Sequence, residues 1–259
     1  MMNRVASIAW HTFKESVRER VLYNLIVFAL LLLGAAILFG SISVGIERII
    51  IVNLGLSSIA VFGLMMAIFI GITLVWKEID RRTIFSILSK PVRRAEFIFG
   101  KYAGLMLTLL INTAIMTAGF YLALFYVKRT LEFADLVALQ AVYFILLQLA
   151  MVVGLALLFS CITTPVLAAV FTFSLYVIGN FLNDIRWFGQ ETGSPLVMKF
   201  TAAIYYLLPN FSNFNVIGQI AHGQRVPGYL LIANSFYALL YVAILLSAAI
   251  LIFEQREFK

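Results

Sequence analysis

Residues 54–75, LGLSSIAVFGLMMAIFIGITLV, carry no charge, whereas the 26 residues that follow, WKEIDRRTIFSILSKPVRRAEFIFGK at 76–101, carry seven Lys/Arg and three Asp/Glu. An uncharged run of this length suits a helix that crosses a hydrocarbon core of about 30 Å, which takes about 20 apolar residues. Water is absent from that core, so the backbone polar groups must pair within the helix. The stretch therefore predicts a transmembrane helix followed by a charged element outside the membrane.

The composition extends this interpretation to the whole chain. Of its 259 residues, 63% are hydrophobic and 12% are charged, and the mean hydropathy is +1.02. Soluble domains are about half apolar and a quarter charged. We therefore expect an all-α integral membrane protein, folded as a single transmembrane domain over residues 1–259. Its six predicted transmembrane helices are the apolar runs at about 21–43, 54–75, 102–127, 136–159, 165–183 and 229–253.

The predicted orientation follows from the basic residues, which are retained on the cytoplasmic side during membrane insertion. With the N-terminus inside, 13 of the 19 Lys/Arg fall on the inner side, before the first span, in 76–101 and in the C-terminal tail. We therefore expect both termini and the 76–101 element to be cytoplasmic, in a bacterial inner membrane. The net charge of +7 then reflects contact with anionic lipid. Nucleic acid is not expected as a partner. The sequence has neither the pattern of a basic nucleic-acid-binding fold nor a set of aromatic residues on which bases could stack.

The N-terminal segment 1–20 precedes the first span and has an amphipathic pattern. Trp10, Phe13 and Val17 fall on one side of a helix over 4–20, and the charged residues fall largely on the others. This pattern suits a helix that lies in the membrane interface. A cytoplasmic extension of the first span is the alternative.

The segment 184–228, between the last two spans, is the largest external piece. Within it the stretch SPLVMKFTAAIYYLLP at 194–209 has Ser194 and Pro195 as a helix start and Pro209 as a stop. The apolar run between them is too short to span a membrane. We expect a re-entrant or interfacial helix there that caps the outer side.

The charged 76–101 element has an amphipathic pattern of its own. Ile79, Ile84 and Leu88 recur at about one and two helical turns, which predicts a helix over 77–89 with one apolar side. Pro91 then forces a bend before the chain enters the next span. A positive-inside anchor would explain the excess of Lys/Arg. It would explain neither the apolar side nor the acids of the element, which favour a surface that docks against a partner.

The spans themselves lack the groups that most membrane chemistry needs. None of the six runs contains Asp, Glu, Lys, Arg or His, which argues against an ion-coupled carrier. Two histidines and one cysteine do not provide a recognisable zinc, haem or iron–sulfur site, and the chain has no G-x-x-x-x-G-K-[ST] phosphate-binding loop. We therefore expect no catalytic, cofactor or metal site in this chain.

Three parts of the sequence resemble the permease subunits of ABC transporters of the ABC-2 type. They are TFKESVRERVLYNLIVF at 12–28, YYLLPNFSNFN at 205–215, and a spaced pattern within the 76–101 element. That pattern consists of Glu78, Thr83, Leu88, Pro91, Arg94 and Gly100-Lys101. More narrowly, these stretches resemble the branch of permeases for multi-copper enzyme maturation. The sequence has no cluster of metal ligands that would support the copper label.

The resemblance implies a type V exporter-like domain with an amphipathic N-terminal helix, a cytoplasmic coupling helix and short external helices. It implies that a separate ATP-binding subunit binds ATP and Mg²⁺ and hydrolyses the ATP, and that a second permease chain, identical or paralogous, completes the pathway. The coupling residues would be Glu78, Asp80, Arg81, Arg82, Thr83, Leu88, Pro91 and Arg94. The alternative function is a membrane scaffold that recruits a cytoplasmic partner through the same element without transporting anything.

Overall fold

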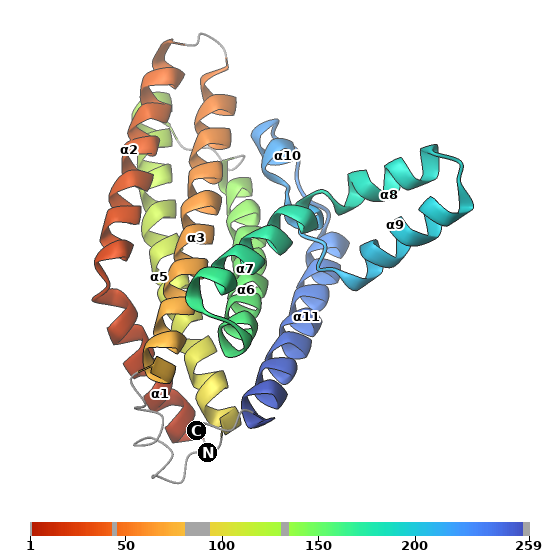
Figure 1. The fold of residues 1–259 in the computed structure, drawn as a ribbon. Coiled ribbons are helices and arrows are strands. Elements are labelled where there is room, and N and C mark those ends of the chain that lie inside the picture. Colours follow the sequence, from red (N-terminus) through yellow and green to blue (C-terminus); the bar gives the residue numbers. More distant parts are fainter. Residues whose placement is uncertain (1, 43–45, 81–93, 131–134, 256–259) are drawn as a thin grey trace.

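The structure is a computed structural model that describes residues 2–42, 46–80, 94–130 and 135–255 (Figure 1). The described residues are almost entirely helical, and no strand occurs among them. The all-α prediction is therefore confirmed for this part of the chain.

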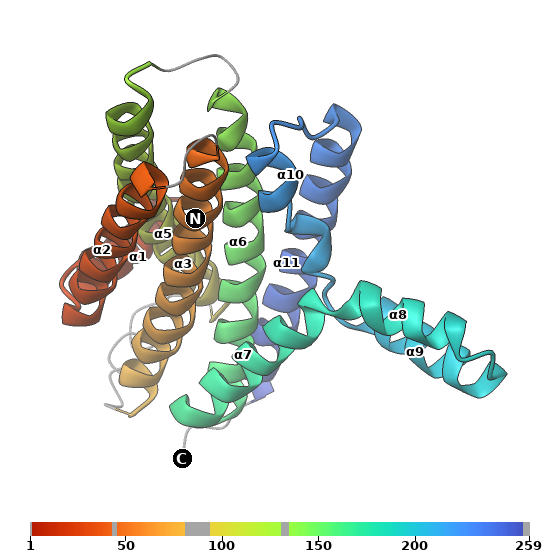
Figure 2. The same ribbon diagram turned by 90° about the horizontal axis from the view of Figure 1, so that it is seen from above.

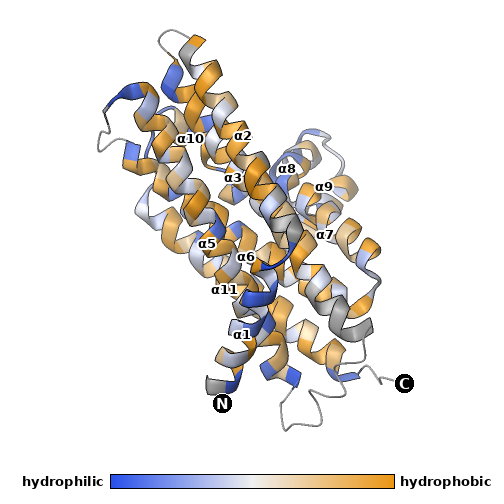
Figure 3. Cartoon of the chain, turned by 90° about the vertical axis from the view of Figure 1, so that its left-hand side faces the viewer, coloured by the Kyte–Doolittle hydropathy of each residue, from blue (hydrophilic) through white to orange (hydrophobic). Residues whose placement is uncertain are grey.

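Five long helices lie side by side and form the bundle (Figures 1 and 2). They are α2 (Arg20–Ile42), α3 (Glu47–Asp80), α5 (Arg94–Lys128), α6 (Ala138–Ile162) and α11 (Gly228–Gln255). Helices α3, α5 and α6 occupy the middle, with α2 on one side and α11 on the other. The one-turn helix η1 (Asp135–Val137) leads into α6. Hydrophobic residues line the length of the bundle, and hydrophilic residues gather toward its ends (Figure 3).

Within the described ranges, four helical segments are long and apolar enough to cross a membrane, namely Glu47–Thr73, Arg94–Lys128, Asp135–Ile162 and Gly228–Gln255. Helix α7 (Pro165–Asn180) and helix α8 (Leu182–Glu191) meet at 52° and would together make a fifth, broken span. In α2, the apolar part is the shorter segment Leu25–Gly40. The structure thus supports four or five spans, and the predicted total of six stays a prediction.

Helices α3 and α5 are longer than the apolar runs that predicted them. Helix α3 begins at Glu47 and α5 at Arg94, each several residues before its predicted span. At 1.5 Å per residue, the 34 residues of α3 measure about 51 Å, well over a hydrocarbon core of about 30 Å. Charged residues at the ends of such a helix do not have to enter the hydrocarbon, so α3 and α5 extend beyond the predicted spans, whose bounds stay a prediction.

The predicted helix over 77–89 lies only partly within the described residues. Lys77 to Asp80 continue α3 without a break. Residues 81–93 fall outside the described part of the chain, and with them the predicted coupling residues Arg81, Arg82, Thr83, Leu88 and Pro91.

The segment after α7 forms a helical hairpin of α8 and α9 (Pro195–Leu207). The hairpin projects sideways from the bundle (Figures 1 and 2). The chain then returns through η2 (Ser212–Phe214) and α10 (Ile217–Ala221). The predicted helix within 194–209 is thus present as α9, and its position at the outer side of the membrane stays a prediction. The 52° bend between α7 and α8 directs the hairpin outward.

Candidate functional site

Four segments meet at one end of the bundle, which is termed the base. They are helix α1 (Met2–Val17), the C-terminal end of α3, the first turns of α5 and the last turn of α11, at the bottom of Figure 1. The ends of α3 and α5 flank residues 81–93, so the base includes the helices that enter and leave the predicted coupling element. The contacts within the base determine which helices would move when a partner binds to that element.

Helix α1 packs closely on α5 at two glycines one turn apart. A Cβ added at Gly104 would lie 2.5 Å from the Ala9 carbonyl oxygen, and one at Gly100 would lie 2.6 Å from Cγ2 of Ile8. Such distances are possible only because both residues lack a side chain, and small residues are typical where membrane helices approach closely. The seam fixes α1 to the base of α5.

The residues that α1 buries differ from the apolar side that the sequence indicated. Thr12 and Ser16 are buried, one turn apart, whereas Trp10 is 52% exposed. The Ser16 hydroxyl donates a hydrogen bond to the Thr12 carbonyl at 2.8 Å, so its polarity is satisfied within the helix. The small side chains of Thr12 and Ser16 allow α1 to approach α5 closely. The large side chain of Trp10 stays exposed on the surface of the bundle.

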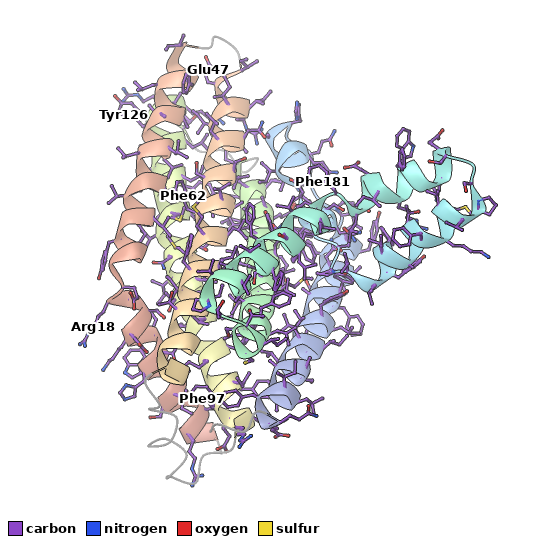
Figure 4. All side chains as sticks on the ribbon, in the orientation of Figure 1. Arg18, Glu47, Phe62, Phe97, Tyr126 and Phe181 are labelled. Atoms are coloured by element: carbon purple, nitrogen blue, oxygen red, sulfur yellow. The ribbon has the colours of Figure 1, made fainter. Side chains whose placement is uncertain are left out.

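A buried cation of α5 contacts α1 and lies beside an aromatic pair that joins α5 to α11. Lys101 is 2% exposed, and its Nζ lies 3.7 Å from Oε2 of Glu15 on α1. The same ammonium lies 5.8 Å from the centroid of the Phe97 ring, which stacks on Phe253 of α11 at 5.6 Å. Burying an unpaired ammonium would be costly, so its contacts with Glu15 and Phe97 constrain where α1 and α5 can sit. Figure 4 shows Phe97 at this end of the bundle.

Arg94 at the start of α5 contacts the end of α11. Its Nη1 donates hydrogen bonds to the backbone carbonyls of Phe253, at 3.0 Å, and Glu254. The last carbonyls of a helix lack partners within the helix and carry partial negative charge, so a guanidinium there is favourable. Arg94 is a predicted coupling residue, and the structure gives it this intramolecular role. Glu78 and Asp80 lie in the last turns of α3.

These contacts determine what the base can do mechanically. Helix α5 is bound to α1 through the glycine seam and Lys101, and to α11 through Arg94 and Phe97. A force applied next to the start of α5 would therefore act on three helices together. In the described part of the chain, no three His, Cys, Asp or Glu side chains lie close enough to hold a metal ion.

The opposite end of the bundle contains an ion cluster that sequence reasoning missed. Asp135 of η1 is 1% exposed, and its carboxylate lies 3.1 Å from Nε of Arg48 and 2.9 Å from Nζ of Lys128. Nη1 of Arg48 also donates to the Ala221 carbonyl of α10 at 3.0 Å. The Tyr121 hydroxyl donates to the Asp135 carbonyl at 3.1 Å. The three charged residues come from separate segments, and no sequence spacing indicated that they would meet.

The stretch at 205–215 holds the hairpin to the bundle. The Phe211 amide donates to the Gly179 carbonyl at 2.9 Å, at the end of α7. The Asn210 amide donates to the Tyr237 hydroxyl of α11 at 2.8 Å, and its side chain donates to Oδ1 of Asn183 at 3.1 Å. Phe211 is fully buried. The stretch at 205–215, one of the three that resemble the family, therefore has a structural role, because it joins the hairpin to the bundle.

Comparison with known families gives a match over almost the whole chain. A sequence model of the family described as ABC-2 family transporter protein matches residues 6–258. The matched range contains the base, the ion cluster and the hairpin. A search of curated proteins finds no match.

Proposed function

Because the chain belongs to the ABC-2 family of transporter proteins and is a multi-pass membrane protein, we propose that it is the permease subunit of an ATP-driven exporter. Permeases of this family typically work with an ABC ATP-binding subunit. The observation that carries the proposal is the base, where Arg94 and Lys101 of the 76–101 element join α5 to α11 and α1. A transport domain with no energy source of its own needs such a junction to receive force from a partner.

The coupling step begins at the 76–101 element. In the proposed complex Glu78 to Pro91 inserts into a cleft of the ATP-binding subunit, with its apolar side buried and its charges setting the register. ATP and Mg²⁺ bind on that subunit. A shift of the element moves the start of α5, and the contacts of Lys101 and Arg94 carry the shift to α1 and α11. The bundle then rocks between two packings as a rigid body.

The complete transporter contains two permease chains and two ATP-binding subunits. The 29.0 kDa chain shows no internal repeat, so the second half of the pathway comes from another chain, identical or paralogous. Each chain contributes six spans, with α2 as the first and the segment 165–183, mostly α7, as the fifth. Both termini and the base face the cytoplasm of a bacterium.

The test is a double variant, Glu78→Ala with Arg82→Ala, co-expressed with the ATP-binding subunit and purified in lipid nanodiscs. Truncating a desolvated interfacial charge costs a few kcal/mol, whereas an exposed pair contributes less than about 1 kcal/mol. We expect at least a tenfold loss of association or of coupled ATP hydrolysis, which corresponds to about 1.4 kcal/mol.

The matched control is Glu191→Ala with Lys199→Ala, which removes one acid and one base from the α8–α9 hairpin and should leave association unchanged. Normal insertion with undiminished association in the Glu78 and Arg82 variant would contradict the coupling role and leave the element as a positive-inside anchor. A complex that binds its partner but transports no substrate would support the scaffold instead.

A further inference from the structure

An apolar groove runs between α2 and α5 toward the end of the bundle opposite the base. It has a volume of about 510 Å³, and its lining includes Leu30, Leu33, Gly34, Ile37, Gly119 and Leu122. A Cβ added at Gly34 would meet nothing within 4 Å. The groove is therefore open at Gly34, and its walls are apolar side chains of α2 and α5.

A polar pocket adjoins this groove at the end of the bundle. Its volume is about 630 Å³, and the charged residues Glu47, Arg48, Lys128 and Arg129 line it. Ile37, Tyr126 and Arg129 line both spaces, so the two are continuous. Figure 4 shows Glu47 and Tyr126 at this end of the bundle. Each space falls in the range of about 300 to 1,000 Å³ that is typical of small-molecule sites.

Arg129 stands where the apolar and polar parts join. It follows the last residue of α5, and its backbone φ is +60°. Residues other than glycine adopt this left-handed conformation at a cost of about 1 to 2 kcal/mol. Its guanidinium carbon lies 5.5 Å from the centroid of the Tyr126 ring. The backbone turn and the ring contact keep a cation at the mouth of an apolar groove.

Among the described residues, the charges around the pocket do not cancel. Arg48, Lys128 and Arg129 contribute three positive charges, and Glu47 and the buried Asp135 contribute two negative charges. Among the residues that the structure describes, this leaves an excess of one positive charge at the ends of α3 and α5, with Glu132 outside the described residues. Arginine is particularly suited to phosphate, because its planar fork of donors matches two phosphate oxygens.

We propose that the groove and the pocket together bind one glycerophospholipid. Its phosphate lies against Arg129 and the Arg48–Lys128 cluster, and one acyl chain follows the groove between α2 and α5 past Gly34. Basic pockets between transmembrane helices on the cytoplasmic side of membranes bind anionic headgroups by the same pairing of cation and phosphate. The site is separate from the base, and its existence does not depend on the chain being an exporter.

The experiment measures lipid retention by native mass spectrometry of the purified, delipidated full chain. Dioleoylphosphatidylglycerol is added to the wild type and to two variants. Arg129→Asn removes the cation while tolerating the left-handed backbone, and Gly34→Leu fills the groove. We expect one bound phospholipid per wild-type chain and at least a tenfold loss of apparent affinity in each variant.

Two matched controls should bind like the wild type. Arg186→Gln removes a cation that stacks on Tyr205 and Tyr206, away from the groove. Gly218→Leu adds a side chain at another glycine whose Cβ would meet nothing within 4 Å. Both controls are tested for folding by their melting temperature beside the two site variants.

Dioleoylglycerol, which has the same chains without the phosphate, and inorganic phosphate serve as comparison ligands. Weaker binding of both supports the proposal. Equal retention in all variants would mean annular lipid only, and binding of inorganic phosphate in preference to the phospholipid would mean a site for free anions. A change of oligomeric mass in Gly34→Leu with unchanged lipid binding would assign the groove to a second copy. Each of these three results overturns the proposal.

Discussion

Asp135 is the residue on which the ion cluster depends. It lies between Arg48 of α3 and Lys128 of α5, and both cations come from helices that are otherwise packed through apolar side chains. The carboxylate is 1% exposed, so its charge is compensated by these partners more than by water. A buried ion pair adds little net stability compared with apolar packing, but removing one member leaves the others uncompensated.

We therefore predict that Asp135→Asn destabilises the protein by about 1 to 3 kcal/mol, because two half-buried cations lose the buried carboxylate that they share. The measurement is the melting temperature and the free energy of unfolding in detergent, which should both fall. Asp184→Asn is the control, since Asp184 is exposed on α8, and it should change the free energy of unfolding by less than about 0.5 kcal/mol. If the two variants were equally stable, the ion cluster would not depend on Asp135.

Among the elements, α1 depends most on tertiary contacts. Its seam with α5 is built on Gly100 and Gly104, where backbone and side chains of α1 come closer than any Cβ would permit. A helix held in this way moves with α5, whereas a helix that merely floats in the membrane interface would move independently. The proposed coupling step requires the first arrangement.

We predict that Gly104→Val displaces α1 from α5, because the new Cβ would lie 2.5 Å from a backbone carbonyl oxygen that cannot move away alone. Hydrogen exchange of the α1 amides should become faster, while exchange in α6 stays the same. Gly218→Val is the control, because a Cβ there meets nothing within 4 Å. Unchanged protection of α1 in Gly104→Val would show that the seam does not hold the helix.

Hydrophobic runs were sufficient to predict where the long helices lie, because burial in hydrocarbon requires apolar residues of a set length. The direction of the α8–α9 hairpin was not predictable in this way. It follows from the bend after Asn180 and from the bond between the Phe211 amide and the Gly179 carbonyl, which joins residues 32 positions apart. The buried face of α1 was missed for a similar reason, since small residues carry no hydrophobic signal.

At the scale of the whole molecule, the two ends of the bundle differ in kind. The base joins helices through Lys101, Arg94 and a glycine seam, at the C-terminal end of the 76–101 element. The other end joins them through the Asp135 cluster and a polar pocket. The resemblance pointed to the first end through the motif in 76–101, but the second end had no motif, because its charges meet only when α3, α5 and η1 pack together.

The orientation of these two ends in the membrane is the last prediction. Because 13 of the 19 Lys/Arg fall on the side of the base, the positive-inside rule places the base in the cytoplasm. A cysteine in place of Arg93, beside the start of α5, should react with a membrane-impermeant maleimide only after the cytoplasmic side is exposed. A cysteine in place of Gln190 on the exposed hairpin should react in intact cells.

The unmodified chain is the background control for this labelling, since its one cysteine, Cys161, is 1% exposed and should stay unlabelled from either side. The proposed coupling to a cytoplasmic ATP-binding subunit requires the base and the hairpin to be labelled from opposite sides. Reaction of the cysteine at 93 in intact cells would place the base outside, where ATP is not supplied, and the coupling proposal would then fail together with the orientation.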